Sequence, residues 1–129
     1  MKTKFRAWDK EIKKMVSVVQ LHFPEHWLQV RLDNSEQNYK GYGGRHSFNN
    51  EETDRFVLMQ YSNKDDKNGK EIYENDLCKT ISSEVVQIVF VEASFLFERI
   101  NVDNEYGLII CESLEVIGNI YEDIVLYKL

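Results

Sequence analysis

The segment from Asp65 to Cys78 constrains the fold of this chain more than any other, because it combines turn residues and strand residues within a short space. Asn68-Gly69 is the pair that most readily places two successive residues at positive φ in a tight hairpin. Asn75-Asp76 then offers a second reversal before the apolar pair Leu77-Cys78. The segment therefore predicts that a β-rich module begins here.

Period-two alternation and runs of β-branched residues predict strands on both sides of this segment. In the first half, a polar loop separates residues 4–8 from residues 15–19, a pattern typical of a β-hairpin. Further runs of strand-forming residues follow at the close spacing of small sandwiches and barrels, over 55–61, 85–91, 94–97, 107–110 and 114–121. We predict about eight or more short strands, little helix, and a small barrel formed largely from Phe56 onward.

Two parts of the first half lack a clear strand pattern. From Leu21 to Leu32 the pattern is mixed, since Pro24 can open a short helix as its first residue, while Leu28-Gln29-Val30 can also be a strand. We favour a short helix or turn. The polar stretch from Asp33 to Asp54 carries three glycines and predicts a loop, the most variable part of the chain.

Size and composition indicate one ordinary folded domain, with 129 residues that are 43% hydrophobic and 29% charged. The formal charge of −6 repels a phosphate backbone and argues against nucleic acid as a partner. No apolar run is long enough to span a membrane, and no signal-peptide core follows the N-terminus. We therefore expect a cytoplasmic protein without membrane association, in which Cys78 and Cys111 are buried thiols.

The strand predicted over 85–91 has large apolar side chains on both faces. Val86, Ile88 and Phe90 fall on one face, and Val85, Val89 and Val91 fall on the other. Both faces then need cover, which fits a central strand or one at a subunit interface. Because large exposed apolar patches are uncommon on soluble monomers, we predict a homo-oligomer with Val85, Val89 and Val91 at or just beneath the contact.

Two histidines have a spacing that occurs in metal sites. His22 and His26 are four residues apart, which places two imidazoles on one face of a helix, but Pro24 lies between them and no third ligand follows. The glycines of the loop could hold an anion beside Arg45 and His46, but the segment lacks the lysine and following Ser or Thr of a phosphate-binding loop. We predict no metal site and no cofactor.

Three carboxylates near the Asn-Gly pair are the other candidates for chemistry. Asp65, Asp66 and Asp76 could form a site for hydrolysis or for a divalent cation. Acids beside such a turn usually support the turn through side-chain hydrogen bonds, and we interpret Asp76 as structural. We predict no catalytic residue.

Four motifs spread over the chain carry a resemblance to a known family. They are Lys4–Asp9 followed by Lys14-Met15, then Val57–Tyr61, Asp66–Asp76 and Leu114–Glu122. In order and spacing they resemble the YopX family of phage and prophage proteins, and only residues 21–54 have no match. The resemblance implies a bacteriophage or prophage origin in a bacterial host, a mainly β fold with an SH3-like barrel in the second half, and no established activity. We expect a single YopX-like domain over 1–129, with the N-terminal hairpin and variable loop region in 1–55 and the barrel in 56–129.

The chain departs from the family pattern at two turns. It has Ser62-Asn63-Lys64 where relatives commonly have Thr-Gly-Leu, and Asn75-Asp76 where they have Gly-Asp. Asn is the non-glycine residue that best tolerates the left-handed region, so we expect the same backbone path. A role that required a bare glycine close to a ligand would be lost.

The aromatic residues of the strand-like segments are expected to fill the core. SH3-like barrels often use aromatic side chains between hairpin loops as a platform for a peptide or a nucleic acid. By that analogy, the candidates for an exposed interaction site are Tyr61, Tyr73 and Tyr121.

Three classes of function remain. The first is a non-enzymatic phage accessory protein that acts as an interaction or assembly module, self-associates, and has a phage or host protein partner. The second is a nucleic-acid-associated barrel module, which an exposed basic face with stacked aromatic rings would favour. The third is an enzyme with a carboxylate site at Asp65, Asp66 and Asp76.

Overall fold

The computed structural model describes residues 3–23, 25–31, 45–49, 53–100, 106–108 and 113–123. These residues contain eleven strands, β1 to β11, and no α-helix. The strands form two antiparallel sheets. The predictions of a mainly β fold and of many short strands are confirmed.

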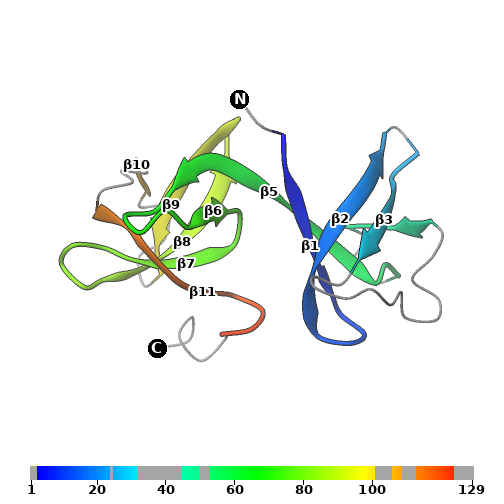
Figure 1. The fold of residues 1–129 in the computed structure, drawn as a ribbon. Coiled ribbons are helices and arrows are strands. Elements are labelled where there is room, and N and C mark those ends of the chain that lie inside the picture. Colours follow the sequence, from blue (N-terminus) through cyan, green and yellow to red (C-terminus); the bar gives the residue numbers. More distant parts are fainter. Residues whose placement is uncertain are drawn as a thin grey trace. The chain divides into compact units, whose positions relative to one another are not determined.

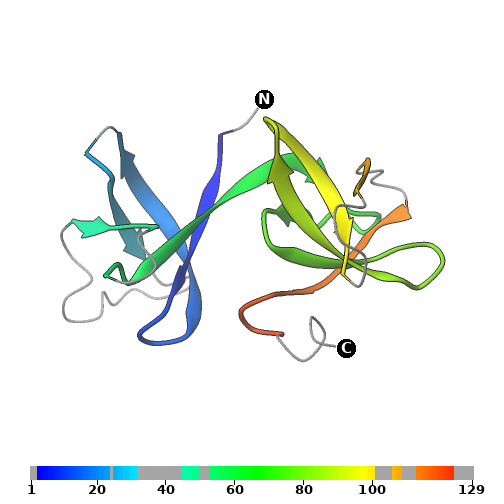
Figure 2. The same ribbon diagram turned by 180° about the vertical axis from the view of Figure 1, so that it is seen from behind.

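The chain divides into two compact units, each with a hydrophobic core of its own. The N-terminal unit is Lys4–Met59, and the C-terminal unit is Gln60–Leu129 together with Met1–Thr3. The division lies inside one long strand, β5 (Phe56–Asp65), which Figures 1 and 2 draw as a continuous arrow. The sequence placed the change of region at residues 55 and 56, close to the start of this strand.

The N-terminal unit is built from a β-hairpin extended by further strands. Its strands are β1 (Phe5–Asp9), β2 (Lys14–His22), β3 (Trp27–Arg31), β4 (His46–Ser47) and the first part of β5. Their order in the sheet is β4-β3-β2-β1-β5. The buried side chains that form the core are Ala7, Val16, Leu28, Val30, Phe48 and Phe56. The predicted hairpin of the first half is therefore confirmed as β1 and β2, paired from Arg6 with Ser17 to Asp9 with Lys14.

Of the short helix or turn favoured between Leu21 and Leu32, the described residues contain the turn, at Phe23, Glu25 and His26, and no helix. Strand β2 continues to His22, and β3 pairs with it in antiparallel register from His22 with Trp27 to Ser17 with Arg31. The alternative reading of Leu28-Gln29-Val30 as a strand is correct, because Leu28 and Val30 point into the core. Burial on the sheet decided between two patterns that are locally similar.

The C-terminal unit is a curved sheet around a second core. Its strands are the rest of β5, β6 (Glu71–Tyr73), β7 (Asp76–Lys79), β8 (Val85–Val91), β9 (Ser94–Arg99), β10 (Tyr106–Leu108) and β11 (Glu115–Asn119). Five of them form a sheet in the order β10-β9-β8-β7-β11, and β6 pairs with β5. The buried core side chains are Ile72, Cys78, Val86, Ile88 and Leu114, with Phe95, Phe97 and Val116 packed against them. Among the described residues the strands do not close into a barrel, so the mainly β fold is the part of the prediction that the structure bears out.

Candidate functional site

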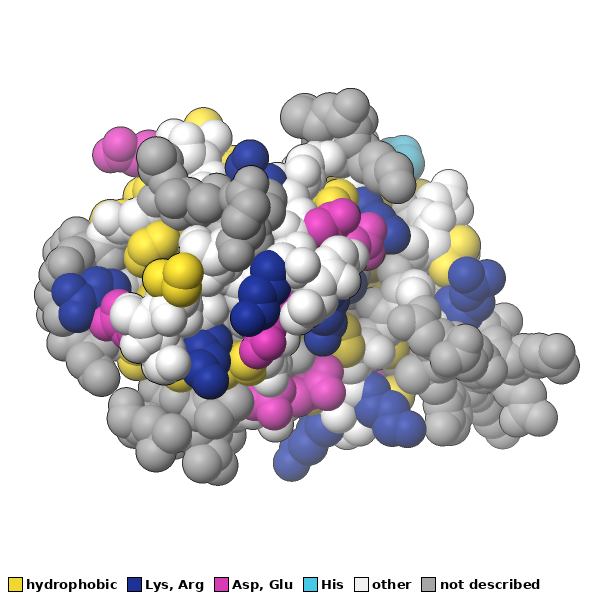
Figure 3. Space-filling model, turned by 60° about the vertical axis from the view of Figure 1, so that its left-hand side comes forward, with side chains coloured by type: hydrophobic (Ala, Val, Ile, Leu, Met, Phe, Trp, Pro, Cys, Tyr) yellow, Lys and Arg dark blue, Asp and Glu magenta, His cyan; other side chains and the backbone are white. Residues whose placement is uncertain are grey.

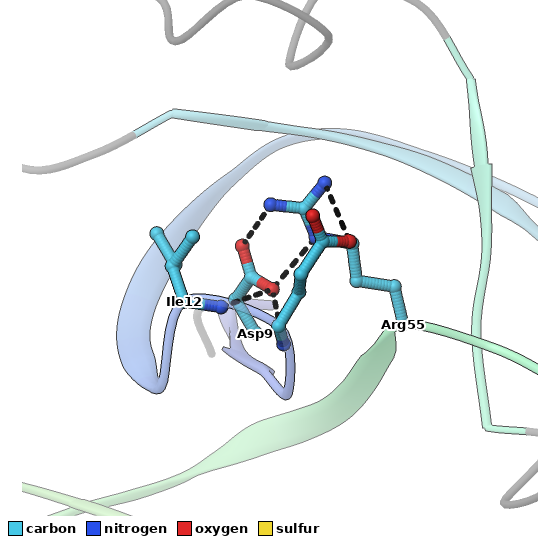
Figure 4. Close-up of polar contacts among 4 residues, drawn as sticks. Asp9, Ile12 and Arg55 are labelled. Carbon is cyan, nitrogen blue, oxygen red and sulfur yellow. Dashed lines mark hydrogen bonds and ion pairs between the residues drawn. The ribbon is translucent and has the colours of Figure 1, made fainter.

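A buried carboxylate organises the turn between β1 and β2 (Figure 4). Asp9 is fully buried, and Arg55 Nε and Nη2 donate to its two oxygens at 2.7 and 2.9 Å. The backbone amides of Glu11 and Ile12 also donate to Asp9 Oδ1, at 3.0 and 3.4 Å. Both carboxylate oxygens are thus engaged by the chain itself. The pair fixes the turn to the residue before β5, and its role is structural.

Asp66 holds the turn between β5 and β6. Its Oδ1 accepts hydrogen bonds from the backbone amides of Asn68 and Lys70 at 2.8 and 2.9 Å, and its Oδ2 accepts one from the amide of Val116 at 2.8 Å. Burial raises the pKa of Asp66, but these three hydrogen bonds and the charge of Lys70 outweigh burial, so the pKa is lowered from 3.8. The ionised carboxylate therefore links the turn to β11.

The Asn68-Gly69 turn differs in detail from the prediction. Gly69 has φ 81°, but Asn68 is absent from the described residues with positive φ. The Gly69 amide donates to the Asp66 carbonyl at 3.0 Å, and the Asp66 amide donates to the Lys70 carbonyl at 2.7 Å. This is a type I turn followed by a left-handed glycine, a three-residue hairpin loop. The turn and its need for glycine are confirmed, whereas two successive positive φ angles are not found here.

Asn75 connects three parts of the C-terminal unit. Its amide donates to the Ile88 carbonyl at 2.8 Å, and its carbonyl accepts from the Ile120 amide at 3.1 Å. Its side chain accepts from Gln87 Nε2 at 3.2 Å and donates to the Tyr121 hydroxyl at 3.4 Å. Tyr121, one of the three candidate tyrosines, is half-buried, and its hydroxyl contributes to this network.

Asp76 is buried, and its Oδ2 accepts a hydrogen bond from the Tyr73 amide at 2.7 Å, as expected of a structural residue. Burial and the negative charges of Asp76 and Asp66 raise the pKa of Cys78 to about 12. Cys78 is a free, buried thiol, as predicted, while Cys111 lies outside the described residues. A thiol with so high a pKa remains protonated near neutral pH and is a poor nucleophile.

The other two candidate tyrosines are buried. Tyr61 and Tyr73 are 6% and 8% exposed, and their ring centroids lie 5.5 Å apart across the paired strands β5 and β6. The Tyr61 hydroxyl donates to the Asp65 carboxylate, and the Tyr73 hydroxyl donates to Glu71 at 3.4 Å. These rings pack inside the protein and do not form an exposed platform.

Exposed apolar side chains occur in both units. The large ones are Val19, Phe23, Ile81, Phe90 and Tyr106. Figure 3 shows one face of the protein, on which hydrophobic side chains reach the surface between Lys, Arg, Asp and Glu. Phe23 and Phe90 each lie on a surface that has further aromatic or apolar side chains.

The outer face of the β8-β9 hairpin is the surface that the sequence singled out. Val86 and Ile88 point into the core, while Val85, Val89 and Val91 lie on the opposite face and are half-buried. A further half-buried side chain, Leu96, stands directly opposite Val89 on β9. On the core side, Phe90 is 48% exposed and its ring lies 4.7 Å from that of Phe95. The outer face thus carries three valines with Gln87 among them, and its cover is incomplete.

The tip of the same hairpin has an unusual backbone. Val91 pairs with Ser94, so the loop between them consists of Glu92 and Ala93 alone. Both residues have positive φ, 49° and 64°, the conformation of a type I′ turn that usually requires Asn or Gly. The register of six paired residues in β8 and β9 imposes this conformation on residues that disfavour it.

An aromatic cluster, which we call the ring cluster, lies at the turn end of the β2-β3 hairpin. It consists of His22, Phe23, His26, Trp27 and Phe48, all in the N-terminal unit. In the sequence, the spacing of His22 and His26 suggests no role other than metal binding. Their rings instead stack on different aromatic partners, and the described residues contain no group of three potential metal ligands.

One half of the ring cluster is centred on Trp27. The rings of His22 and Trp27 are nearly parallel, with an interplanar angle of 4° and centroids 4.8 Å apart. The guanidinium of Arg45 lies over the Trp27 ring at 4.4 Å. Glu25 Oε2 accepts a hydrogen bond from Trp27 Nε1 at 3.0 Å and lies 3.6 Å from His22 Nδ1. The Glu25 carboxylate thus contacts both rings of this half of the cluster.

The other half of the ring cluster packs on Phe48. His26 stacks on Phe48 with centroids 5.3 Å apart, and Phe23 meets both rings edge to face at 5.5 and 5.9 Å. Phe48 is buried, whereas Phe23 is 55% exposed and His26 is exposed. Phe23 is therefore held in a defined position while much of its ring surface faces solvent. Of the glycine loop considered for anion binding, Arg45 and His46 are described, and His46 packs against Phe56 at 5.0 Å.

A sequence model of one protein family, described as YopX protein, matches residues 4–128. The chain belongs to the YopX family. The crystal structure of protein EF1440 from Enterococcus faecalis is similar to this YopX-family chain, with a TM-score of 0.68 and 25% sequence identity over 98% of this chain and 99% of that one. The comparison with curated proteins found no match. No helix in the described residues is long and apolar enough to cross a membrane.

The two departures from the YopX pattern behave as predicted. Asn63 has φ 65° within β5, where the pairing with β6 is irregular between Tyr61 and Asp65, and Asn75 has φ 69° in the turn between β6 and β7, so asparagine occupies the left-handed region at both positions. At Asn75 the side chain adds the two hydrogen bonds that a glycine could not make. Asparagine therefore adopts the left-handed backbone at both positions, while the match of the whole backbone path to that of relatives stays a prediction.

Sequence reasoning missed the buried pair and the ring cluster. Asp9 and Arg55 are 46 residues apart, and neither has a local pattern that indicates burial. A signal for the ring cluster did exist, since a hairpin reading of residues 14–31 would have placed His22 opposite Trp27. The preference for a helix concealed it.

Proposed function

We propose that this YopX-family chain is a phage or prophage accessory protein that acts as a non-enzymatic interaction or assembly module in the bacterial cytoplasm. The observation that carries the proposal is the incompletely covered outer face of the β8-β9 hairpin. The carboxylates considered for catalysis support it indirectly, because Asp66 and Asp76 use their oxygens to hold backbone amides. A phage or host protein is the expected partner beside a second copy of the chain.

The contact in this proposal is self-association through Val85, Val89 and Val91. Cross-strand neighbours share a face, so Val89 and Leu96 form one apolar strip along the outer side of the hairpin. Burying such a strip against a second copy removes apolar area from water at about 25 cal/mol per Å². The two-residue turn at Glu92-Ala93 ends this hairpin directly after the strip.

The SH3-like barrel implied by the family resemblance is part of the same proposal. Lys67 donates its amide to the Leu114 carbonyl at 3.0 Å, and Asp66 accepts from the Val116 amide. These contacts link the β5-β6 turn to β11, the strand at the opposite side of the five-stranded sheet from β10. A contact of this kind is what closure of a small barrel requires.

Light scattering on the purified protein at micromolar concentration tests the proposal. We expect an oligomer for the parent chain and a folded monomer for Val89→Asp, with folding checked by circular dichroism. Ile81→Asp is the matched control, because it introduces the same charge at an apolar residue that is 88% exposed at the β7-β8 turn, and it should leave the oligomer intact. A parent chain of monomer mass, with Val89→Asp unfolding it, would return β8 to the monomer core and remove the argument.

The protein partner is found by a different experiment. Tagged protein purified from infected or induced host cells should retain a specific phage or host protein, and Val89→Asp should release it if the hairpin face is the contact. Recovery of the same proteins with the parent and the variant would place the contact elsewhere.

A further inference from the structure

The charge of the chain is divided unequally between its two units. Residues 4–59 contain nine Lys and Arg against eight Asp and Glu, a formal charge of +1. The remaining residues contain seven against fourteen, a formal charge of −7, which together give the −6 of the whole chain. All three histidines lie in the N-terminal unit. The negative charge that repels a phosphate backbone therefore belongs to the C-terminal unit and not to the N-terminal one.

The N-terminal unit also carries an exposed aromatic ring, Phe23, beside the exposed arginine Arg45. Bases stack on aromatic side chains and on arginine guanidinium groups, and every base has a face that can do so. Phe23, which is 55% exposed, and the exposed guanidinium of Arg45 offer such surfaces beside Trp27 and His22, at the turn end of the β2-β3 hairpin. Glu25, the acid within the stack, already accepts the Trp27 indole hydrogen.

We propose that the ring cluster binds single-stranded nucleic acid, with a base stacked on Phe23 and Arg45 contacting the backbone phosphate. Arginine can stack on an aromatic ring and donate to a phosphate at the same time, because its donors lie in the plane of the guanidinium. A protein partner fits this surface less well, since Arg45 provides a cationic group and hydrogen-bond donors beside the rings rather than an apolar pocket. The site is independent of the β8-β9 hairpin, so it would hold whether or not the chain self-associates.

The probe is a fluorescein-labelled single-stranded oligothymidine of about 15 nucleotides, a length near one binding site, followed by anisotropy at about 50 mM salt. We expect saturable binding by the parent chain that weakens as salt is raised. Phe23→Ala should bind about tenfold more weakly, the usual loss for one stacked base. The variant should fold, since the Phe23 ring is largely at the surface.

Three further variants separate the contributions. Arg45→Ala should weaken binding and reduce the slope of log K against log salt by about 0.7, the contribution of one phosphate contact on a single strand. Phe90→Ala removes an equally exposed phenylalanine from the C-terminal unit and should leave binding unchanged. Val89→Asp should also leave it unchanged, which separates this site from the proposed assembly surface.

Several outcomes would overturn the inference. The first is no change in anisotropy up to about 1 mM protein, a concentration far above the dissociation constants of specific sites. The second is equal affinity of Phe23→Ala and the parent chain for the oligomer. The third is equal affinity for a duplex, because paired bases inside a duplex cannot stack on protein rings. An acidic peptide of similar charge that binds as tightly would show that charge alone is recognised. Competition by thymidine monophosphate as effective as that by the oligomer would assign a free nucleotide instead of a strand.

Discussion

Replacing Asp66 by asparagine should destabilise the C-terminal unit through one identifiable hydrogen bond. The amide oxygen of asparagine can still accept from the backbone amides of Asn68 and Lys70, as Asp66 Oδ1 does at 2.8 and 2.9 Å. The amide nitrogen then replaces Oδ2 and faces the Val116 amide, which donates to Oδ2 at 2.8 Å in the parent chain. Two donors meet, and the link between the turn and β11 is lost.

The expected cost is about 2 kcal/mol, the range for losing a hydrogen bond to a charged acceptor and leaving its half-buried donor unsatisfied. Asp66→Ala removes all three hydrogen bonds and should cost roughly 3 to 5 kcal/mol. Urea titration followed by circular dichroism measures both. Glu92→Gln, which removes an exposed carboxylate from the same unit, is the control for charge and should change little.

Two further readouts locate the effect. Both tryptophans, Trp8 and Trp27, lie in the N-terminal unit, so their fluorescence reports on that unit alone. Hydrogen exchange at the Val116 amide should be faster in Asp66→Asn, because that amide loses its acceptor. If the urea midpoint of Asp66→Asn equals that of the parent and Val116 stays protected, the carboxylate does not hold β11.

The effect should also depend on pH in a defined direction. Burial raises the pKa of Asp66, but its hydrogen bonds from Val116, Lys70 and Asn68 lower it more, so the folded pKa lies below the unfolded value of 3.8. The carboxylate therefore contributes stability above pH 3.8, and this contribution is lost as pH falls through the folded pKa. The difference between the parent and Asp66→Asn should shrink below pH 3.8, and a constant difference would refute the assignment.

Three other changes test the turns and the core of the same unit. Gly69→Val should cost roughly 1 to 3 kcal/mol in urea titration, entirely from the backbone, because φ is 81° and no atom lies within 4 Å of the added Cβ; a variant as stable as the parent would disprove the turn. Ala93→Gly should instead stabilise by roughly 0.5 to 1 kcal/mol, since glycine removes the left-handed strain at φ 64° at some cost in unfolded-state entropy, and a lower urea midpoint would contradict this. In a Cys111→Ser background, Cys78 should react with Ellman's reagent at pH 8 only as fast as the protein unfolds locally or globally. The reason is that burial, followed by the charges of Asp76 and Asp66, raises the pKa of Cys78 to about 12. Rapid reaction of the folded chain would show that Cys78 is not buried.

The sequence was sufficient to predict a structural feature wherever that feature depends on one residue and its own backbone. Asn63, Gly69 and Asn75 occupy the left-handed region as their side chains allow, and the alternation of Val86 and Ile88 with polar or half-buried neighbours follows the period of a strand. These rules are steric and act within a few atoms, so the sequence carries them completely.

The sequence by itself thus determined the mainly β fold, the YopX family and the positions of most turns, whereas the tertiary structure decided which residues meet. Asn68-Gly69 looked like the two-residue turn, but that geometry occurs at Glu92-Ala93, where the register of β8 and β9 forces it. The Asp9-Arg55 pair joins residues whose positions along the chain predict no contact, and Phe48 joins the ring cluster from outside the β2-β3 hairpin. The physical reason is that burial and through-space contacts depend on the whole arrangement of strands, and a local pattern cannot contain them.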